Sequence, residues 1–199
     1  SEIVQLPGGE IQMRTREGII YVFFAPTPSG PTAGKLQGLW GPNGSSITLA
    51  SRAGGLLATA TGTSGATLQF AYNTTACPVP VIGSVTDHVG RVVTYQYGSG
   101  CNLSGVERYG APWRSYGYAP GSLLTSDTNA LGHTTSYIYD GSQRVLTLQR
   151  PTVPAQTYNY GAPGATVVTD AVGRVTRYQY DLNSKISQVQ QVDSGLTVA

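Results

Sequence analysis

Pairs of aromatic residues separated by a single residue recur along the chain at a nearly constant spacing. Counted from the first residue of each pair, the successive spacings are 25, 21, 21, 21 and 20 residues. A fixed period of this size indicates a repeat architecture, in which each unit contacts mainly its neighbours. The six pairs are Phe70 and Tyr72, Tyr95 and Tyr97, Tyr116 and Tyr118, Tyr137 and Tyr139, Tyr158 and Tyr160, and Tyr178 and Tyr180.

Turn-forming residues lie on both sides of these pairs. A glycine lies five residues before the pair in four copies, and an aspartate directly follows the pair in the two clearest copies. Glycine supplies the positive φ that tight turns require, and aspartate accepts hydrogen bonds from its own turn. An apolar residue then recurs 13 positions after the glycine, so each unit is predicted to be strand, turn, strand, turn. The predicted turn residues are Gly65, Gly90, Gly132, Gly173, Asp140 and Asp181.

The first strand of a unit alternates with period two. In residues 174–180 both tyrosines fall on one face, and Arg177 and Gln179 fall on the other. A hairpin with one apolar face is only marginally stable alone, so consecutive hairpins must pair edge to edge. The sequence therefore predicts an all-β fold of repetitive antiparallel hairpins in one extended, curved or spiralling sheet. We expect an irregular lead-in with β-strand character at 1–35 and one continuous repeat array at 36–199.

The charge and hydropathy patterns argue against two classes of partner. Charged residues make up 11% of the chain and the net charge is +2, with no basic run of the kind that nucleic-acid binding requires. The longest apolar run, residues 19–25, is far shorter than the roughly 20 residues needed to cross a membrane. Neither nucleic-acid binding nor membrane insertion is therefore expected.

The two cysteines occupy nearly equivalent positions in successive units. Cys77 lies 12 residues after Gly65, and Cys101 lies 11 residues after Gly90. Equivalent positions in adjacent hairpins are neighbours in a sheet, so a disulfide is geometrically reachable. The alternative is a pair of buried thiols. Metal binding would need further cysteine or histidine ligands at suitable spacing, which the sequence lacks.

No motif for catalysis or for a cofactor accompanies the repeat. The recurring aspartates occupy turn positions, where hydrogen bonds from backbone N–H groups are a sufficient explanation. Trp40, Trp113 and the tyrosines could form a surface on which sugars stack, but tyrosines two residues apart are explained more simply by packing on one sheet face. The sequence therefore predicts no enzyme, no catalytic residue, no metal and no cofactor.

The units resemble the YD repeats of Rhs proteins. That pattern is Gly, Arg, a short spacer, Tyr-x-Tyr-Asp, a turn and an apolar strand, and it is carried here by residues 132–145 and 173–186. The copy at residues 90–97 departs from it by Gly98 in place of Asp, and the copies at Tyr116 and Tyr158 lack both the Gly and the Asp. The resemblance covers about residues 36–192. It implies a sheet that spirals into a hollow shell, as in bacterial Rhs and toxin-complex proteins, or a similar barrel as in teneurins.

Taken with the resemblance, these patterns predict a structural YD-repeat protein in an extracellular or cell-surface shell, fibre or other assembly. The alternative is an adhesive or glycan-binding module that recognises a glycan or a cell-surface receptor. Open sheets leave unpaired edge strands, here expected near residues 1–25 and 186–199. The predicted partners are therefore a further YD-repeat chain or identical subunits, joined by edge-strand pairing into a longer spiral or a filament. A disulfide would place the protein outside the cytosol.

Overall fold

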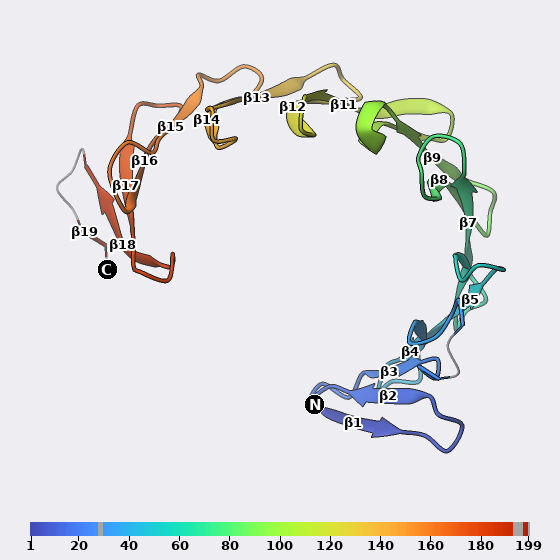
Figure 1. Cartoon of the computed structure of the whole chain (residues 1–199). Helices are drawn as coiled ribbons and strands as arrows, with labels where there is room; N and C mark the ends of the chain where they lie inside the picture. The colour runs from blue at the N-terminus through green and yellow to red at the C-terminus, as the bar shows by residue number, and fades with distance from the viewer. Residues whose placement is uncertain (28–29, 193–196, 199) are drawn as a thin grey trace. The chain divides into compact units, whose positions relative to one another are not determined.

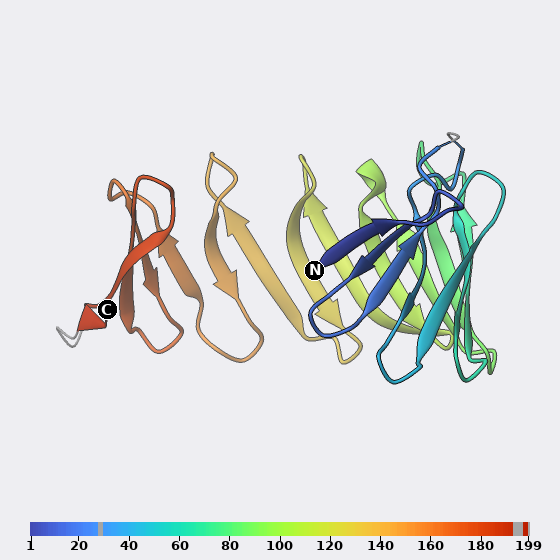
Figure 2. The same cartoon turned by 90° about the horizontal axis from the view of Figure 1, so that it is seen from below.

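The computed structural model describes residues 1–27, 30–192 and 197–198, and its regular structure is almost entirely β-strand. The chain forms two compact units. Figures 1 and 2 show its strands as arrows coloured from blue at the N-terminus to red at the C-terminus. The first unit comprises residues 1–97 and 107–111, and the second comprises residues 98–106 and 112–199.

The first unit contains nine strands in sequence order. They are β1 (Glu2–Gln5), β2 (Ile11–Arg14), β3 (Ile20–Phe23), β4 (Leu36–Trp40), β5 (Ser46–Ser51), β6 (Leu57–Gly62), β7 (Thr67–Asn73), β8 (Val81–Asp87) and β9 (Val92–Tyr97).

The strands β10 (Leu103–Arg108) and β11 (Ala111–Ala119) contribute residues to both units. The second unit also contains the short 3-10 turn η1 (Ser99–Cys101), β12 (Leu123–Asn129), β13 (Thr134–Tyr139), β14 (Val145–Gln149), β15 (Gln156–Asn159), β16 (Ala165–Thr169), β17 (Val175–Tyr180), β18 (Ile186–Gln191) and β19 (Thr197–Val198).

Within each unit every strand pairs in antiparallel fashion with the strand that follows it in sequence. In the first unit, for example, Thr59 of β6 lies opposite Gln69 of β7. In the second, Thr157 of β15 lies opposite Thr169 of β16. The all-β class and the repetitive antiparallel hairpins predicted from the sequence are confirmed.

Five-residue turns join many of the strands and share one hydrogen-bond pattern. In the turn that begins at Asp170, its N–H donates to the carbonyl of Arg174 (2.9 Å), and the N–H of Gly173 donates back to the carbonyl of Asp170 (3.0 Å). The fourth residue takes the left-handed conformation, with φ of 85° at Gly173. This is the three-residue hairpin loop with a bulge, which favours glycine at that position. The glycines predicted from the sequence, Gly65, Gly90, Gly132 and Gly173, all occupy it.

The second residue of an aromatic pair coincides with a bulge in the neighbouring strand. Ile138 lies opposite Thr147, but the next residue, Tyr139, lies opposite Val145, so Leu146 is the extra residue. The same shift occurs at Tyr72, Tyr118 and Tyr180. Because the extra residue belongs to the partner strand, the two aromatic residues of a pair keep the same face of the sheet.

The segment 1–35 contains β1, β2 and β3. Strand β3 carries a further aromatic pair, Tyr21 and Phe23, and Phe23 lies at a bulge against β4. The repeat spacing did not predict this pair, because the connection between β3 and β4 is longer than the other connections and interrupts the spacing.

Few described side chains are deeply buried. Among the described apolar side chains only Cys77, Val106 and Ala165 are buried, with 8%, 5% and 7% of their surface exposed, and most strand residues are half-buried. A conventional core of interlocked side chains is therefore thin, and backbone ladders and cross-strand pairs carry more of the stability. Among the described residues, no helix is both long and apolar enough to cross a membrane.

Candidate functional site

The second tyrosine of four pairs donates a hydrogen bond that joins successive hairpins. In each case the phenol hydroxyl donates to a backbone carbonyl 15 residues earlier. The four bonds run from Tyr97 to Ile82 (2.8 Å), from Tyr118 to Leu103 (3.0 Å), from Tyr139 to Leu124 (2.7 Å) and from Tyr160 to Val145 (2.8 Å).

The backbone ladder explains why these carbonyls need a side-chain donor. Strand β14 pairs with β15 through Thr147 and Leu148, and the ladder stops before Val145. The Val145 carbonyl, which points away from β13, therefore has no ladder partner on β15. A partly buried carbonyl without a donor is unfavourable, and the Tyr160 hydroxyl supplies that donor.

We call the four tyrosines, Tyr97, Tyr118, Tyr139 and Tyr160, together with their four acceptors, the tyrosine relay. The Tyr97 bond lies in the first unit, and the other three lie in the second. In the second unit Tyr118 lies opposite Leu124, whose carbonyl accepts the Tyr139 hydroxyl. Tyr139 in turn lies opposite Val145, whose carbonyl accepts the Tyr160 hydroxyl. Leu124 and Val145 thus each lie opposite the tyrosine of one hairpin and accept the hydroxyl of the tyrosine in the next.

The last pair departs from the relay for a visible reason. Between β16 and β17 the ladder continues to Ala165, which lies opposite Gln179. The neighbouring Gly164 carbonyl accepts the N–H of Tyr180 (2.9 Å), and because hydrogen-bonded pairs alternate along an antiparallel ladder, the Ala165 carbonyl faces away from β17. The Tyr180 hydroxyl instead lies 3.4 Å from the Thr166 hydroxyl, at the limit of a hydrogen bond.

Burial of the phenol raises the pKa of three relay tyrosines, Tyr97, Tyr118 and Tyr160, above the ordinary value. Loss of water contact disfavours the phenolate. These hydroxyls therefore stay protonated and remain donors throughout the physiological pH range.

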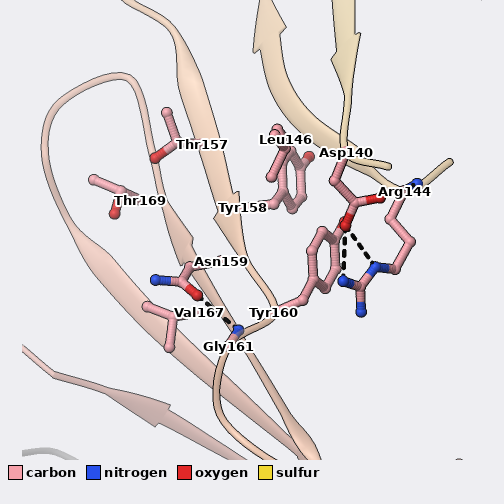
Figure 3. Close-up of a pocket in the computed structure, with 10 residues that line it drawn as sticks. All are labelled: Asp140, Arg144, Leu146, Thr157, Tyr158, Asn159, Tyr160, Gly161, Val167 and Thr169. Atoms are coloured by element: carbon pink, nitrogen blue, oxygen red, sulfur yellow. Dashed lines mark hydrogen bonds and ion pairs between the residues drawn. The ribbon is translucent and has the colours of Figure 1, made fainter. Parts of the chain in front are cut away.

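A shallow concavity of about 470 Å³ lies beside the last relay tyrosine (Figure 3). Arg144 lies against the Tyr160 ring, with its guanidinium carbon 4.3 Å from the ring centroid. The same guanidinium contacts the carboxylate of Asp140 at 2.7 and 2.8 Å. On the other side, Asn159 accepts a hydrogen bond from the N–H of Gly161 (2.8 Å).

The carboxylate of Asp140 is held in its ionised form. Hydrogen bonds from the backbone N–H groups and the guanidinium of its own turn, led by the Arg144 N–H, lower the pKa of Asp140 below its ordinary value, although desolvation opposes them. An acid that is ionised and paired in this way is a poor general acid at neutral pH. The arrangement is suited to closing a turn and clamping a tyrosine ring.

The same aspartate and arginine pairing recurs in two further turns. Asp87 pairs with Arg91 at 2.6 Å, and Asp170 pairs with Arg174 at 2.8 Å, each four residues apart. In both, one carboxylate oxygen also accepts hydrogen bonds from two backbone N–H groups of the turn. The sequence showed these aspartates as turn caps but not their arginine partners, although the Asp-x-x-Gly-Arg spacing carries that signal.

The predicted repeat residues lie at equivalent places. All twelve aromatic residues lie on strands β7, β9, β11, β13, β15 and β17, apart from Tyr160, which directly follows β15. Asp140 and Asp181 begin the turns after β13 and β17, and the N–H groups two and four residues later donate to each of them. Within the part of the chain that the structure describes, no group of three His, Cys, Asp or Glu residues could hold a metal ion.

The two cysteines lie in loops that follow strands. Cys77 is buried in the loop between β7 and β8, whereas Cys101 is half-buried at the end of η1 with φ of 60°. The disulfide between Cys77 and Cys101 remains a prediction.

The fold is that of an Rhs-type repeat array, as comparison with solved structures shows. The crystal structures of TcdB2–TccC3 with Cdc42, and of TcdB2–TccC3 without its hypervariable C-terminal region, each align with 98% of this chain at a TM-score of 0.54 and 12% sequence identity. They are Rhs-repeat shell proteins of Tc toxins, so the resemblance predicted from the sequence is confirmed at the level of the fold.

A sequence relative is the double-stranded DNA deaminase toxin A of Burkholderia cenocepacia (strain H111), which is 34% identical over 113 residues, or 52% of this chain. No family model matches the sequence. The chain spans 8% of the length of the deaminase toxin and 15% of the aligned chains in the two crystal structures.

Proposed function

We propose that this chain is a non-catalytic wall segment: a YD-repeat array that forms part of a larger protein shell in a secreted, toxin-related assembly. The tyrosine relay carries this proposal. The hydroxyls of the relay tyrosines connect one hairpin to the next, and a shell wall needs such connections between its hairpins. The shell proteins with the same fold, and the toxin with the related sequence, support the context.

The partners that follow from this function are other segments of similar repeat sheet. Such segments would join through strand edges, because the ladder is the main contact between neighbouring hairpins in each unit. The proposed secretion is supported by the toxin relative, and the predicted disulfide would agree with it, because disulfides form and persist mainly outside the cytosol.

The test combines an activity assay with a structural one. The purified chain is incubated with double-stranded DNA, and deamination is measured by sequencing. We expect no converted bases above the background of a buffer control. Conversion that the Asp140→Asn variant abolishes would overturn the non-catalytic assignment.

Native-state hydrogen exchange tests the wall itself. In a repeat array each hairpin depends mainly on its neighbours, so Tyr139→Ala should lower the protection of β12 to β15 more than that of β17 and β18. Uniform loss of protection across the second unit would indicate a single cooperative core instead. Gln143→Ala, in the turn after Tyr139, is the matched control and should leave the pattern nearly unchanged.

A further inference from the structure

The outer edge of β1 is open for strand pairing, and its hydrogen-bonding groups can be identified. The N–H of Leu6 donates to the carbonyl of Glu10 (2.8 Å), which makes this residue pair the first hydrogen-bonded rung of the hairpin between β1 and β2. Hydrogen-bonded and non-hydrogen-bonded pairs alternate along an antiparallel ladder. With Val4 opposite Gln12, the next hydrogen-bonded rung is therefore at Val4.

It follows that Ile3 and Gln5 point their N–H and C=O groups away from β2. The next junction agrees with this assignment. There the N–H of Thr15 donates to the carbonyl of Ile19 (2.9 Å), so Met13, opposite Tyr21, bonds to β3 and not to β1. Among the described strands of the first unit, β1 is in register with β2 alone, on its inner edge.

The side chains along the edge show which kind of strand fits it. Ile3 begins a row that continues through Met13, Tyr21, Leu39 and Ile47, one residue from each of β1 to β5. Ile3 exposes 69% of its surface, whereas Met13, Tyr21 and Leu39 within the row are half-buried. An added strand with an apolar or aromatic residue beside Ile3 would continue the row.

The length of the edge matches the junctions already present in the chain. Three paired residues join β4 to β5, β6 to β7, and β8 to β9, and β1 offers four. The edge carries one charge, Glu2, and no proline, so it lacks the features that usually prevent strand addition.

We propose that β1 is a docking edge for one antiparallel strand of a further YD-type hairpin, bound through the backbone of Ile3 and Gln5 with an aromatic or apolar residue beside Ile3. This proposal rests on the proposed wall function and names its contact. A second copy of this chain is a less suitable occupant. Two stable separate partners bury about 1,200–2,000 Å² of surface, and a contact along one four-residue strand buries far less than that. The incoming strand therefore needs tethering or further contacts.

The experiment supplies the strand on a tether and measures amide hydrogen exchange. A copy of residues 174–180, the YD-type strand β17, is fused before Ser1 through a flexible Gly/Ser linker of about eight residues, which keeps the strand near the edge. We expect the Ile3 and Gln5 amides to exchange at least about tenfold more slowly than in a fusion with a scrambled copy.

A proline at the edge gives the matched control. Gln5→Pro removes only an outward N–H, and proline is tolerated at such edge positions. It should abolish the protection of Ile3, whereas Gln5→Thr should keep it. Protection of the Val4 amide, which bonds to β2, shows in every variant that the hairpin is folded.

Three results would overturn the proposal. The first is equal exchange at Ile3 and Gln5 in the fused and scrambled chains while Val4 stays protected. The second is protection of both amides in the unfused chain at all concentrations, which would mean that the edge is already covered. The third is protection that rises with concentration in the unfused chain, which would make a second copy the partner. None of these results bears on the DNA assay, so failure of the docking edge is distinguishable from failure of the wall function.

Discussion

Removing a single hydroxyl from the tyrosine relay tests whether it stabilises the junction between hairpins. The Tyr139→Phe substitution keeps the ring and deletes the donor that lies 2.7 Å from the Leu124 carbonyl. The net value of such a hydrogen bond is about 0.5–1.5 kcal/mol. Because the carbonyl is only partly buried, water can replace part of the loss, and we expect a cost of about 1 kcal/mol.

The assay is thermal unfolding followed by circular dichroism. For a unit of about 100 residues that unfolds cooperatively, 1 kcal/mol corresponds to a fall in Tm of roughly 4–8 °C. Tyr137→Phe is the matched control, since among the described residues the Tyr137 hydroxyl has no hydrogen-bond partner. That variant should leave Tm nearly unchanged.

A combined variant sharpens the measurement. Relay sites in successive hairpins are two strands, or roughly 10 Å, apart, so their effects should add. Replacing Tyr118, Tyr139 and Tyr160 by phenylalanine together should cost about 3 kcal/mol, three times the single effect. Equal Tm values for the Tyr139→Phe and Tyr137→Phe variants, or a combined variant no less stable than the single one, would refute the role assigned to the relay.

Three other predictions concern the turns and the cysteines. Gln143 has φ of 63° at a position that favours glycine, so Gln143→Gly should raise the free energy of unfolding by about 0.5–1 kcal/mol in urea titrations. Hydrogen bonds lower the pKa of Asp140 in the folded chain, so its contribution to stability is present above the ordinary pKa of 3.8 and is lost as the pH falls through the lower folded value. Urea midpoints measured from pH 5 to pH 2 should therefore fall less steeply in Asp140→Asn than in the unmodified chain. If Cys77 and Cys101 are joined, reduction should cost about 2–4 kcal/mol, and peptide mapping without reductant that finds both cysteines alkylated would contradict the pairing.

The sequence predicted the features that depend on local pattern. The period-two alternation of side chains and the turn glycines predicted the hairpins. The sequence also showed an apolar residue 13 positions after Gly132, and this residue, Val145, is the acceptor of a relay bond. The bond itself could not be predicted, because it depends on where the ladder between β14 and β15 stops, and that is set by the register and the bulge at Tyr139. Similarly, Tyr21 and Phe23 form an aromatic pair separated by one residue but do not follow the repeat period, so the structure was needed to identify the pair.

The constant spacing of 15 residues between each relay tyrosine and its acceptor determines where residues can be inserted into this chain. Each donor and acceptor delimit a window, such as residues 103–118 or 124–139, and a residue inserted into either strand of that window would shift the register and misplace the hydroxyl. Between these windows lie the turns at residues 98–102, 119–123 and 140–144.

Among the six aromatic pairs, the longest spacing has its extra residues in such an interval, between Tyr72 and Ile82, while its window keeps the same length. The interval after Tyr160 is one residue shorter than those turns, and there the hydroxyl of the next tyrosine loses its carbonyl acceptor. Insertions, duplications and grafted loops should therefore be accepted at these intervals and rejected within the strands of the windows, which marks the boundaries at which repeats of this kind can be exchanged.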